Sequence, residues 1–229
     1  REFNVAVVGA TGAVGEEILM ILDEMDIPVK KIIPLASANS AGSDVQFKGK
    51  DVTVIELTET VFEEHDIEIA LFSAGGSISE KFAPFAAKAG AVVIDNTSHF
   101  RMHEDVPLVV PEVNPEDIKE WKKTGIIANP NCSTIQMVQT LKPLDREFGI
   151  KRVDVSTYQA VSGAGKVAMD ELMGQTRDLL NFDFENTKKE AFPHKIAINV
   201  IPQIDVFYDH GFTKEEIKMI EETKKILHK

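Results

Sequence analysis

The chain has 229 residues, a formal net charge of −12 and a hydrophobic content of 43%. This is enough apolar material for one large domain or two ordinary ones. The negative charge disfavours nucleic acid and anionic membrane surfaces as partners, and no apolar run in the chain approaches the ~20 residues that a membrane helix needs. One cysteine cannot form an internal disulfide, and no signal-peptide pattern is present. We therefore expect a soluble cytoplasmic protein.

The first half of the chain alternates short apolar runs with segments of helical periodicity. Strands are expected at 4–8, 30–37, 51–57, 67–73 and 91–96, and helices at 16–25 and 79–90, the second in spite of Pro84. Such alternation is typical of a parallel sheet wound with right-handed crossovers. It predicts an α/β, Rossmann-like domain over residues 1–128.

The pattern changes after residue 128. One long helix is expected over 132–149, bent or interrupted at Pro143, and further helices over 167–180 and 213–229. Strands are expected at 151–161, where apolar and polar residues alternate, and at 195–203. The second half, residues 129–229, is therefore predicted to be an α+β domain.

The stretch "GATGAVG" places Gly9, Gly12 and Gly15 between the first strand and the first helix. Glycine permits positive φ and close backbone approach, and the free N–H groups of a helix start attract a pyrophosphate. The spacing is a variant of the G-x-G-x-x-G fingerprint of dinucleotide-binding folds. The alternative is a glycine turn that only lets the strand and the helix pack together.

The segment after the second strand lacks the acidic residue that accepts hydrogen bonds from the ribose of NAD. It offers Ser37, Asn39 and Ser40 instead. Small neutral side chains leave room for the 2′-phosphate of NADP, so NADP is the predicted cofactor. The alternative is an ordinary polar loop.

Cys132 stands at the expected start of the long helix, after "NPN". The dipole and unpaired N–H groups of a helix start favour a thiolate, which is the nucleophilic form of cysteine. A thiol combined with a nicotinamide is a known route for aldehyde oxidation or acyl reduction. The alternative is a small, inert, buried residue.

Other polar residues suit an anionic substrate. Arg101 follows a strand end, where a guanidinium can bind a carboxylate or a phosphate. Gln159 precedes a second glycine turn that could lie against a ligand. Glu215 and Lys218 lie three apart on one helix face, a spacing that most often marks a solvated pair.

The assembled motifs resemble the bacterial aspartate-β-semialdehyde dehydrogenase family, in the order and spacing of that family and over essentially the whole chain. They are "GATGAVG", "LASANSAG", "SAGGSISEKFAP", "VIDNTSHFRM", "VPLVVPEVNPE", "ANPNCSTIQMV", "TYQAVSGAGK" and "EEIKMIEETKKIL". The N-acetyl-glutamyl-phosphate reductases share the architecture, but their cysteine motif is closer to G-x-x-G-C-Y.

The resemblance implies the NADPH-dependent, reversible and phosphate-dependent reduction of aspartyl phosphate to aspartate semialdehyde, in lysine, threonine and methionine synthesis. It implies a homodimer, small-molecule substrates and no metal in the site. Cys132 would be the nucleophile and Gln159 would orient the acyl group. Substrate and phosphate would contact Arg101, Asn131, Glu215 and Lys218. The cofactor would contact Gly9, Thr11, Gly12, Ala13, Val14, Gly15, Ser37, Asn39, Ser40, Ser73, Ala74, Gly75, Ser162 and Gly163.

Two departures from the family are expected to matter. The family usually carries a basic residue where this chain has Asn39, which leaves dual use of NAD open. The sequence also stops after "KKILHK", before the family's segment with the substrate-clamping arginine and the acid/base histidine. We therefore expect a piece of a longer protein with little turnover by itself. The alternatives are N-acetyl-glutamyl-phosphate reductase and a catalytically silent dinucleotide-binding protein.

Overall fold

The structure is a computed structural model that describes residues 1–25 and 27–229. It divides into two compact units. Unit 1 comprises Arg1–Val153 and Lys218–Lys229, and unit 2 comprises Asp154–Ile217.

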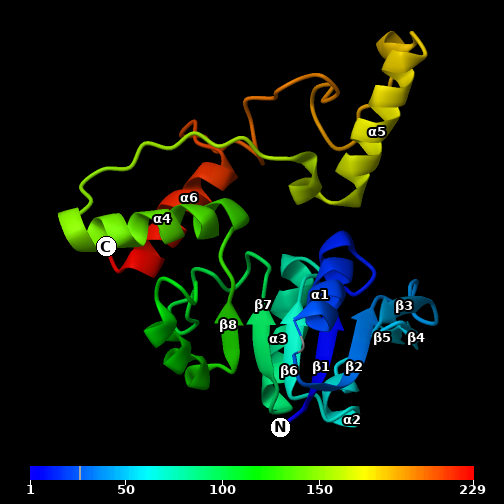
Figure 1. Cartoon of the computed structure of the whole chain (residues 1–229), viewed down its shortest axis with the longest axis vertical. Coiled ribbons are helices and arrows are strands. Elements are labelled where there is room, and N and C mark those ends of the chain that lie inside the picture. The colour runs from blue at the N-terminus through cyan, green and yellow to red at the C-terminus, as the bar shows by residue number, and fades with distance from the viewer. Residues whose placement is uncertain (26) are drawn as a thin grey trace. The chain divides into compact units, whose positions relative to one another are not determined.

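Unit 1 contains a parallel sheet of six strands in the order β5-β2-β1-β6-β7-β8 (Figure 1). The strands are β1 (Phe3–Val8), β2 (Val29–Ala36), β5 (Ile55–Glu56), β6 (Ile69–Phe72), β7 (Val92–Asp95) and β8 (Ile126–Ala128). The chain builds outward from β1 to one side through β2 and then to the other side through β6. The order therefore reverses between β1 and β6, and their carboxyl ends form the switch point where such sheets bind ligands. The predicted α/β, Rossmann-like fold is confirmed.

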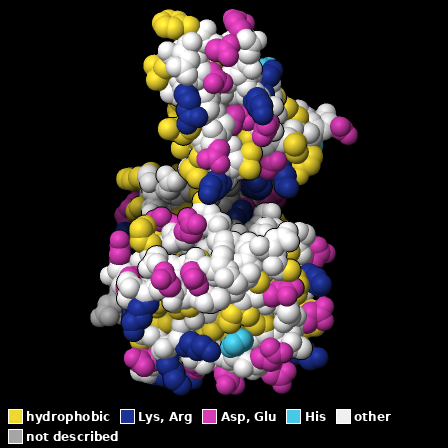
Figure 2. Space-filling view, turned by 90° about the vertical axis from the view of Figure 1, so that its right-hand side faces the viewer, with side chains coloured by type: hydrophobic (Ala, Val, Ile, Leu, Met, Phe, Trp, Pro, Cys, Tyr) yellow, Lys and Arg dark blue, Asp and Glu magenta, His cyan; other side chains and the backbone are white. Residues whose placement is uncertain are grey.

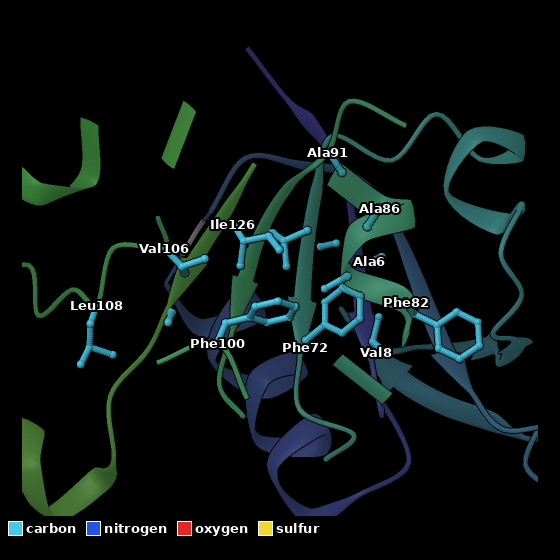
Figure 3. Packing of buried hydrophobic residues seen from close by; sticks show 14 of the residues in the cluster. Ala6, Val8, Phe72, Phe82, Ala86, Ala91, Phe100, Val106, Leu108 and Ile126 are labelled. Atoms are coloured by element: carbon cyan, nitrogen blue, oxygen red, sulfur yellow. The ribbon is translucent and has the colours of Figure 1, made fainter. Parts of the chain in front are cut away.

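Strand β1 is buried on both faces because its apolar residues alternate between two core clusters. Val5 and Val7 pack with Leu19 on one side of the sheet, whereas Val8 packs in the larger cluster on the other side. Figure 3 shows part of that larger cluster, in which Val8 lies beside Phe72, its register partner on β6. A continuous apolar strand of this kind is expected where helices cover both faces of a parallel sheet.

Three helices of unit 1 belong to the α/β winding: α1 (Ala13–Glu24), α2 (Val61–Glu64) and α3 (Gly76–Lys88). Helix α3 continues through Pro84, as predicted, although proline removes one intrahelical hydrogen bond. Its buried face, with Phe82, Ala83 and Ala86, packs in the larger core cluster. Burial of this apolar face offsets the missing bond.

The remaining elements of unit 1 are a hairpin, a 3₁₀ segment and two long helices. The hairpin pairs β3 (Asp44–Phe47) with β4 (Lys50–Thr53), and the 3₁₀ segment η1 covers Pro115–Lys123. Helix α4 (Cys132–Phe148) runs without interruption through Pro143. Helix α6 (Lys214–Leu227) begins in unit 2, and its residues from Lys218 onward belong to unit 1, where Glu222 accepts a hydrogen bond from the N–H of Asn131, the N-cap residue of α4.

Unit 2 contains helix α5 (Lys166–Leu180), the 3₁₀ segments η2 (Val161–Ala164) and η3 (Phe184–Asn186), and the first turn of α6. Thr213 begins α6 with a capping box. Its Oγ1 accepts a hydrogen bond from the N–H of Glu216 at 3.2 Å, and the Glu216 carboxylate accepts from the N–H of Thr213 at 2.6 Å. The helix start predicted at Thr213 is thus confirmed.

The predicted strands at 151–161 and 195–203 are wrong. Residues 151–160 are exposed throughout, and no described strand pairs with them, so their backbone groups face water. In the other segment the N–H groups of Ile196 and Ala197 donate to the side-chain oxygen of buried Gln175, at 2.8 and 3.1 Å. A side chain has taken the hydrogen bonds that a neighbouring strand would otherwise accept.

Figure 2 shows acidic and basic side chains interspersed with apolar ones on the visible face. Within residues 1–25 and 27–229, no helix has the length and apolar character needed to cross a membrane. The same residues contain no group of three or more His, Cys, Asp and Glu side chains that could hold a metal ion.

Candidate active site

The glycine turn after β1 is closed by two glycines that no other residue could replace without strain. Gly9 has φ +89°, and a Cβ at this position would lie 3.0 Å from atoms of Ala74. A Cβ on Gly15 would lie 2.1 Å from the carbonyl oxygen of Gly9 and 2.8 Å from Cα of Ala10. Gly12 is less constrained, because its Cβ would meet the Gly9 oxygen at 3.4 Å. The first and third glycines therefore hold the turn against α1 and the loop after β6.

The start of α1 is open to an anion. Gly12 is its N-cap residue and provides no side-chain cap, so the first N–H groups of the helix lack the partner that a serine or aspartate would supply. Thr11, Gly12 and Val14 are exposed, and Ala13 is partly exposed. A helix start with these properties fits a pyrophosphate.

The loop after β6 lies next to this turn at the switch point of the sheet. The N–H of Ser73 donates to the carbonyl oxygen of Val8 at 2.9 Å, and the Ser73 hydroxyl donates to the same oxygen at 3.2 Å. Ala74 and Gly75 are exposed, and Gly75 begins α3 with φ +98° and no side-chain cap. The structure thus brings together the two predicted cofactor segments, residues 9–15 and 73–75.

The third predicted cofactor segment follows β2, the other neighbour of β1. Ser37 and Asn39 are exposed and Ser40 is partly buried. The carbonyl oxygen of Ser37 accepts from the N–H of Ser40 at 2.9 Å, which closes the loop into a turn. The carboxyl ends of neighbouring parallel strands meet at one edge of a sheet, so this turn lies on the same edge as the glycine turn.

Arg101 is almost fully buried, with 8% of its surface exposed. Its Nε donates to the carbonyl oxygen of Asn129 at 2.9 Å, and Nη2 donates to that of Asn96 at 3.0 Å. Its Nη1 donates to the carboxylate of Glu222 at 3.0 Å. Three of the five N–H groups of a guanidinium are therefore used inside the protein. Arg101 links the ends of β7 and β8 to α6 in addition to any contact with a ligand.

The loop that carries Arg101 is anchored by a buried carboxylate at the end of β7. Asp95 accepts hydrogen bonds from the Ser79 hydroxyl at 2.8 Å, from the N–H of Thr97 at 3.0 Å and from the Thr97 hydroxyl at 2.9 Å. The side chains of Asn96 and Asn129 bond to each other at 2.7 Å. The ends of β7 and β8 thereby form a fixed frame for the guanidinium.

Cys132 is the first residue of α4 and its side chain is exposed. Asn131 caps the helix. Its side-chain oxygen accepts from the N–H groups of Ser133 at 2.9 Å and Thr134 at 3.2 Å. The exposed thiol removes the alternative that Cys132 is only a small buried core residue. It also lies where the dipole of a 17-residue helix favours negative charge.

Lys225 of α6 binds the backbone of the Arg101 loop. Its Nζ donates to the carbonyl oxygens of Arg101 at 2.8 Å, His103 at 2.7 Å and Val106 at 2.8 Å. Burial lowers the pKa of Lys225 from its ordinary value, and the Asp117 carboxylate opposes that shift. The lysine is therefore a structural clamp on the loop.

In unit 2, two of the predicted site residues contact each other. The side-chain nitrogen of Gln159 donates to the carboxylate of buried Glu215 at 3.3 Å, and the Thr157 hydroxyl donates to the side-chain oxygen of Gln159 at 3.0 Å. Ser162 and Gly163 are exposed within η2. Lys218 follows Glu215 by three residues on α6 and is partly buried.

Comparison with known proteins identifies the family. Residues 4–121 match the family model described as semialdehyde dehydrogenase, NAD binding domain, and residues 141–229 match the one described as semialdehyde dehydrogenase, dimerisation domain. A Campylobacter jejuni protein called aspartate-semialdehyde dehydrogenase is 67% identical over 229 residues, covering 100% of this chain and 67% of that protein. The chain belongs to the aspartate-semialdehyde dehydrogenase family. Its glycine turn is accordingly part of a nicotinamide dinucleotide-binding domain.

Solved structures of this family have the same fold. The Vibrio cholerae aspartate semialdehyde dehydrogenase II complexed with ASA is 55% identical, with a TM-score of 0.95, and the match covers 100% of this chain and 67% of that chain. The Candida albicans aspartate semialdehyde dehydrogenase with NADP is 27% identical, with a TM-score of 0.70, over 99% of this chain and 60% of that chain. The chain spans about two thirds of the length of its curated relatives, with 67% of the Campylobacter jejuni protein and 66% of the Aquifex aeolicus one.

Sequence reasoning missed Glu222, whose carboxylate contacts two predicted site residues. Besides its bond to Arg101, its carboxylate accepts from the backbone N–H of Asn131 at 2.7 Å. A signal was present in the sequence. Glu222 lies three residues after Met219 and four before Ile226, both buried, so helical periodicity places a carboxylate on the apolar face of α6. A charge at such a position requires a partner.

Proposed function

We propose that the protein reduces L-aspartyl-4-phosphate to L-aspartate 4-semialdehyde with NADPH, reversibly and with phosphate as the second product. The supporting observation is the exposed thiol of Cys132 at the capped start of α4, in a chain whose relatives are named for this semialdehyde. The proposal extends to the role of each predicted site residue.

The residues of the glycine turn fit a dinucleotide. The turn can close because Gly9 and Gly15 have no Cβ, which would collide with Ala74 and with the Gly9 carbonyl oxygen, respectively. The first N–H groups of α1 have no side-chain cap and can bind phosphate oxygens. Gly9, Thr11, Gly12, Ala13, Val14 and Gly15 would hold the pyrophosphate. Ser73, Ala74 and Gly75, with Ser162 and Gly163, would lie at the nicotinamide side. When bound, the reduced nicotinamide supplies a hydride.

The chain's own contribution begins with the Cys132 thiolate. Its sulfur attacks the acyl carbon of aspartyl phosphate, a C–S bond forms, and the C–O bond to phosphate breaks with release of phosphate. Arg101, Asn131 and Lys218 would bind the phosphate, while Gln159 and Glu215 would orient the acyl substrate. After reduction of the thioester carbon, the C–S bond breaks, the aldehyde leaves and the thiolate is restored.

The experiment uses the full-length protein that contains these 229 residues and measures the phosphate-dependent reduction of NADP⁺ with aspartate semialdehyde by the absorbance of NADPH. Cys132→Ser should lower kcat by three orders of magnitude or more, because the oxyanion of serine is not available at neutral pH. The variant should still bind NADPH with the wild-type Kd, since the glycine turn is unchanged. Wild-type turnover by Cys132→Ser would refute the role of the thiol. Turnover of the N-acetyl-glutamate semialdehyde instead would reassign the substrate.

We propose NADP as the preferred cofactor, because Ser37, Asn39 and Ser40 place no carboxylate at the end of β2. The solved Candida albicans relative is described as a complex with NADP, which supports the assignment. Ser37→Asp would place a negative charge beside the 2′-phosphate and should weaken NADPH binding at least about tenfold relative to NADH. Ser37→Asn is the matched neutral control and should change the ratio much less. Equal ratios in the two variants would exclude this loop from phosphate recognition.

We also propose a cytoplasmic homodimer, with residues 1–128 as the cofactor domain and residues 129–229 as the catalytic and dimerisation domain. The matched models at 4–121 and 141–229 support this division, and the second carries the dimerisation description. Light scattering coupled to size-exclusion chromatography should give twice the mass of the chain. A monomer at micromolar concentration would contradict the proposal.

A further inference from the structure

Glu222 connects two parts of unit 1 that carry proposed site residues. It lies on α6 with 1% of its surface exposed. One carboxylate oxygen accepts from Arg101 Nη1 at 3.0 Å, and the other accepts from the backbone N–H of Asn131 at 2.7 Å. A single side chain thus bonds to the loop after β7 and to the residue that precedes Cys132.

The position of Glu222 is costly for a carboxylate. Removing a charged group from water is unfavourable unless partners compensate, and a well-packed apolar residue in place of a buried ion pair is often neutral or stabilising. Met219 and Ile226, which flank Glu222 on the buried face of α6, are apolar and buried. The carboxylate is therefore better explained by what it orients than by the stability it provides.

The two bonds of Glu222 act on groups that are already constrained. Nε and Nη2 of Arg101 donate to the carbonyl oxygens of Asn129 and Asn96. The bond from Nη1 to Glu222 adds a third contact, and the three together fix the orientation of the guanidinium plane. At Asn131, the side chain caps α4 while the backbone N–H points to Glu222. Fixing Asn131 on both sides fixes the backbone from which Cys132 projects.

We propose that Glu222 is a positioning residue, which holds the Arg101 guanidinium and the Asn131–Cys132 helix start in one fixed geometry. The inference rests on the proposed function, because it assigns the phosphate to Arg101 and the nucleophile to Cys132. Lys225, one turn further along α6, supports the same loop through the carbonyl oxygens of Arg101, His103 and Val106. Helix α6 thereby bonds to the loop in two ways. Glu222 bonds to the side chain of Arg101, and Lys225 bonds to backbone carbonyl oxygens of the loop.

The test compares Glu222→Gln with Glu221→Gln in the phosphate-dependent assay. The control removes the same charge from the neighbouring position of α6, where the Glu221 side chain is 45% exposed and pairs with Lys224. Because displacements near 1 Å can cost about 100-fold in rate, Glu222→Gln should lower kcat by about 10- to 100-fold and raise the KM for phosphate. Glu221→Gln should retain both parameters.

Glu222→Asp covers the possibility that the glutamine variant does not fold. Aspartate keeps the negative charge but is one methylene shorter, so it cannot reach both Arg101 and Asn131 in their present positions. It should fold and still lose at least about tenfold in kcat. The folded fraction of each variant is measured from the fluorescence of Trp121, the only tryptophan in the chain, which lies in unit 1.

The outcomes separate this inference from the proposed function. If wild-type protein reduces NADP⁺ and Cys132→Ser does not, the proposed function stands whatever Glu222 does. If Glu222→Gln and Glu222→Asp then keep kcat and the KM for phosphate within twofold of the values of Glu221→Gln, the positioning role is overturned. Glu222 would have only a structural role. A full-length wild-type protein, which contains these 229 residues, without phosphate-dependent activity would overturn both.

Discussion

Gly15 offers the sharpest structural test of the cofactor turn. In Gly15→Ala, the new methyl group would lie 2.1 Å from the carbonyl oxygen of Gly9 and 2.8 Å from its carbonyl carbon. These are backbone atoms, so no side-chain rotation can relieve the contact. Either the turn opens or the start of α1 moves away from it.

The loss of folding free energy expected in Gly15→Ala is the difference between the cost of overpacking and the gain from replacing a helical glycine. Overpacking a tight site costs about 1–3 kcal/mol, and contact with backbone at this distance places Gly15→Ala at the upper end. Alanine in turn stabilises the folded state by about 1 kcal/mol relative to glycine, because it loses less conformational entropy when the helix forms. The net loss of folding free energy is about 2 kcal/mol, which lowers the urea midpoint by about 1 M for an m-value near 2 kcal/mol/M.

Gly12→Ala is the matched control in the same turn. Its Cβ would meet the Gly9 oxygen at 3.4 Å, an ordinary contact. The lower preference for alanine at an N-cap offsets its entropic gain, so the stability change should be within about 0.5 kcal/mol.

The assay is urea unfolding monitored by Trp121 fluorescence, with NADPH titration of the folded protein. Gly15→Ala should unfold at lower urea and bind NADPH at least about tenfold more weakly, because the displaced Gly9 carbonyl opens the phosphate cradle. If Gly15→Ala has the midpoint of the wild type and of Gly12→Ala, the turn is not closed as described.

Three further predictions concern helices α4 and α6 and their bonds to the rest of unit 1. Asn131→Ala removes the cap of α4 and should lower stability by about 1 kcal/mol, with a smaller loss in Asn131→Asp, measured by urea unfolding. Glu222→Met and Arg101→Met should each lower the free energy of unfolding by about 3–5 kcal/mol, because each leaves its charged partner buried and unpaired. The double variant should lose less stability than either single variant. Losses that add up in the double variant would contradict a coupled pair. The pKa of Asp145 lies below its ordinary value of 3.8 because the N–H of Ile150 and the ammonium of Lys229 bond to the carboxylate. A lowered pKa in the folded state contributes stability above about pH 4 that is lost as the pH falls through the folded value, so Asp145→Asn should flatten the acid dependence of the unfolding midpoint.

Local patterns predicted most of unit 1 because each of its elements is consistent with its own sequence. In strand β1 the run Val5–Val8 is apolar and buried on both faces of the sheet. In unit 2, Thr213 with Glu216 likewise forms the capping box that the helix start indicated. Even Pro84 did not interrupt α3, because Phe82, Ala83 and Ala86 around it are buried in the core.

The failures arise where distant residues decide the outcome. The alternation at 151–161 has a strand period, but a strand requires a neighbour, and none lies beside it among the described residues. At 195–203, Gln175 takes the N–H groups of Ile196 and Ala197, a contact across 21 and 22 positions that no local pattern contains. Glu222 was overlooked because its partners are 121 and 91 positions away.

The central claim is that the Cys132 sulfur accepts the acyl group from phosphate. Intact-mass spectrometry of the protein incubated with L-aspartyl-4-phosphate, without the nicotinamide cofactor, tests it directly, since the chain contains one cysteine. The expected result is a single aspartyl adduct on the peptide that carries Cys132, removed by hydroxylamine and absent from Cys132→Ser. An unmodified Cys132 in protein that binds NADPH with normal affinity, or an adduct on another residue, would contradict the claim.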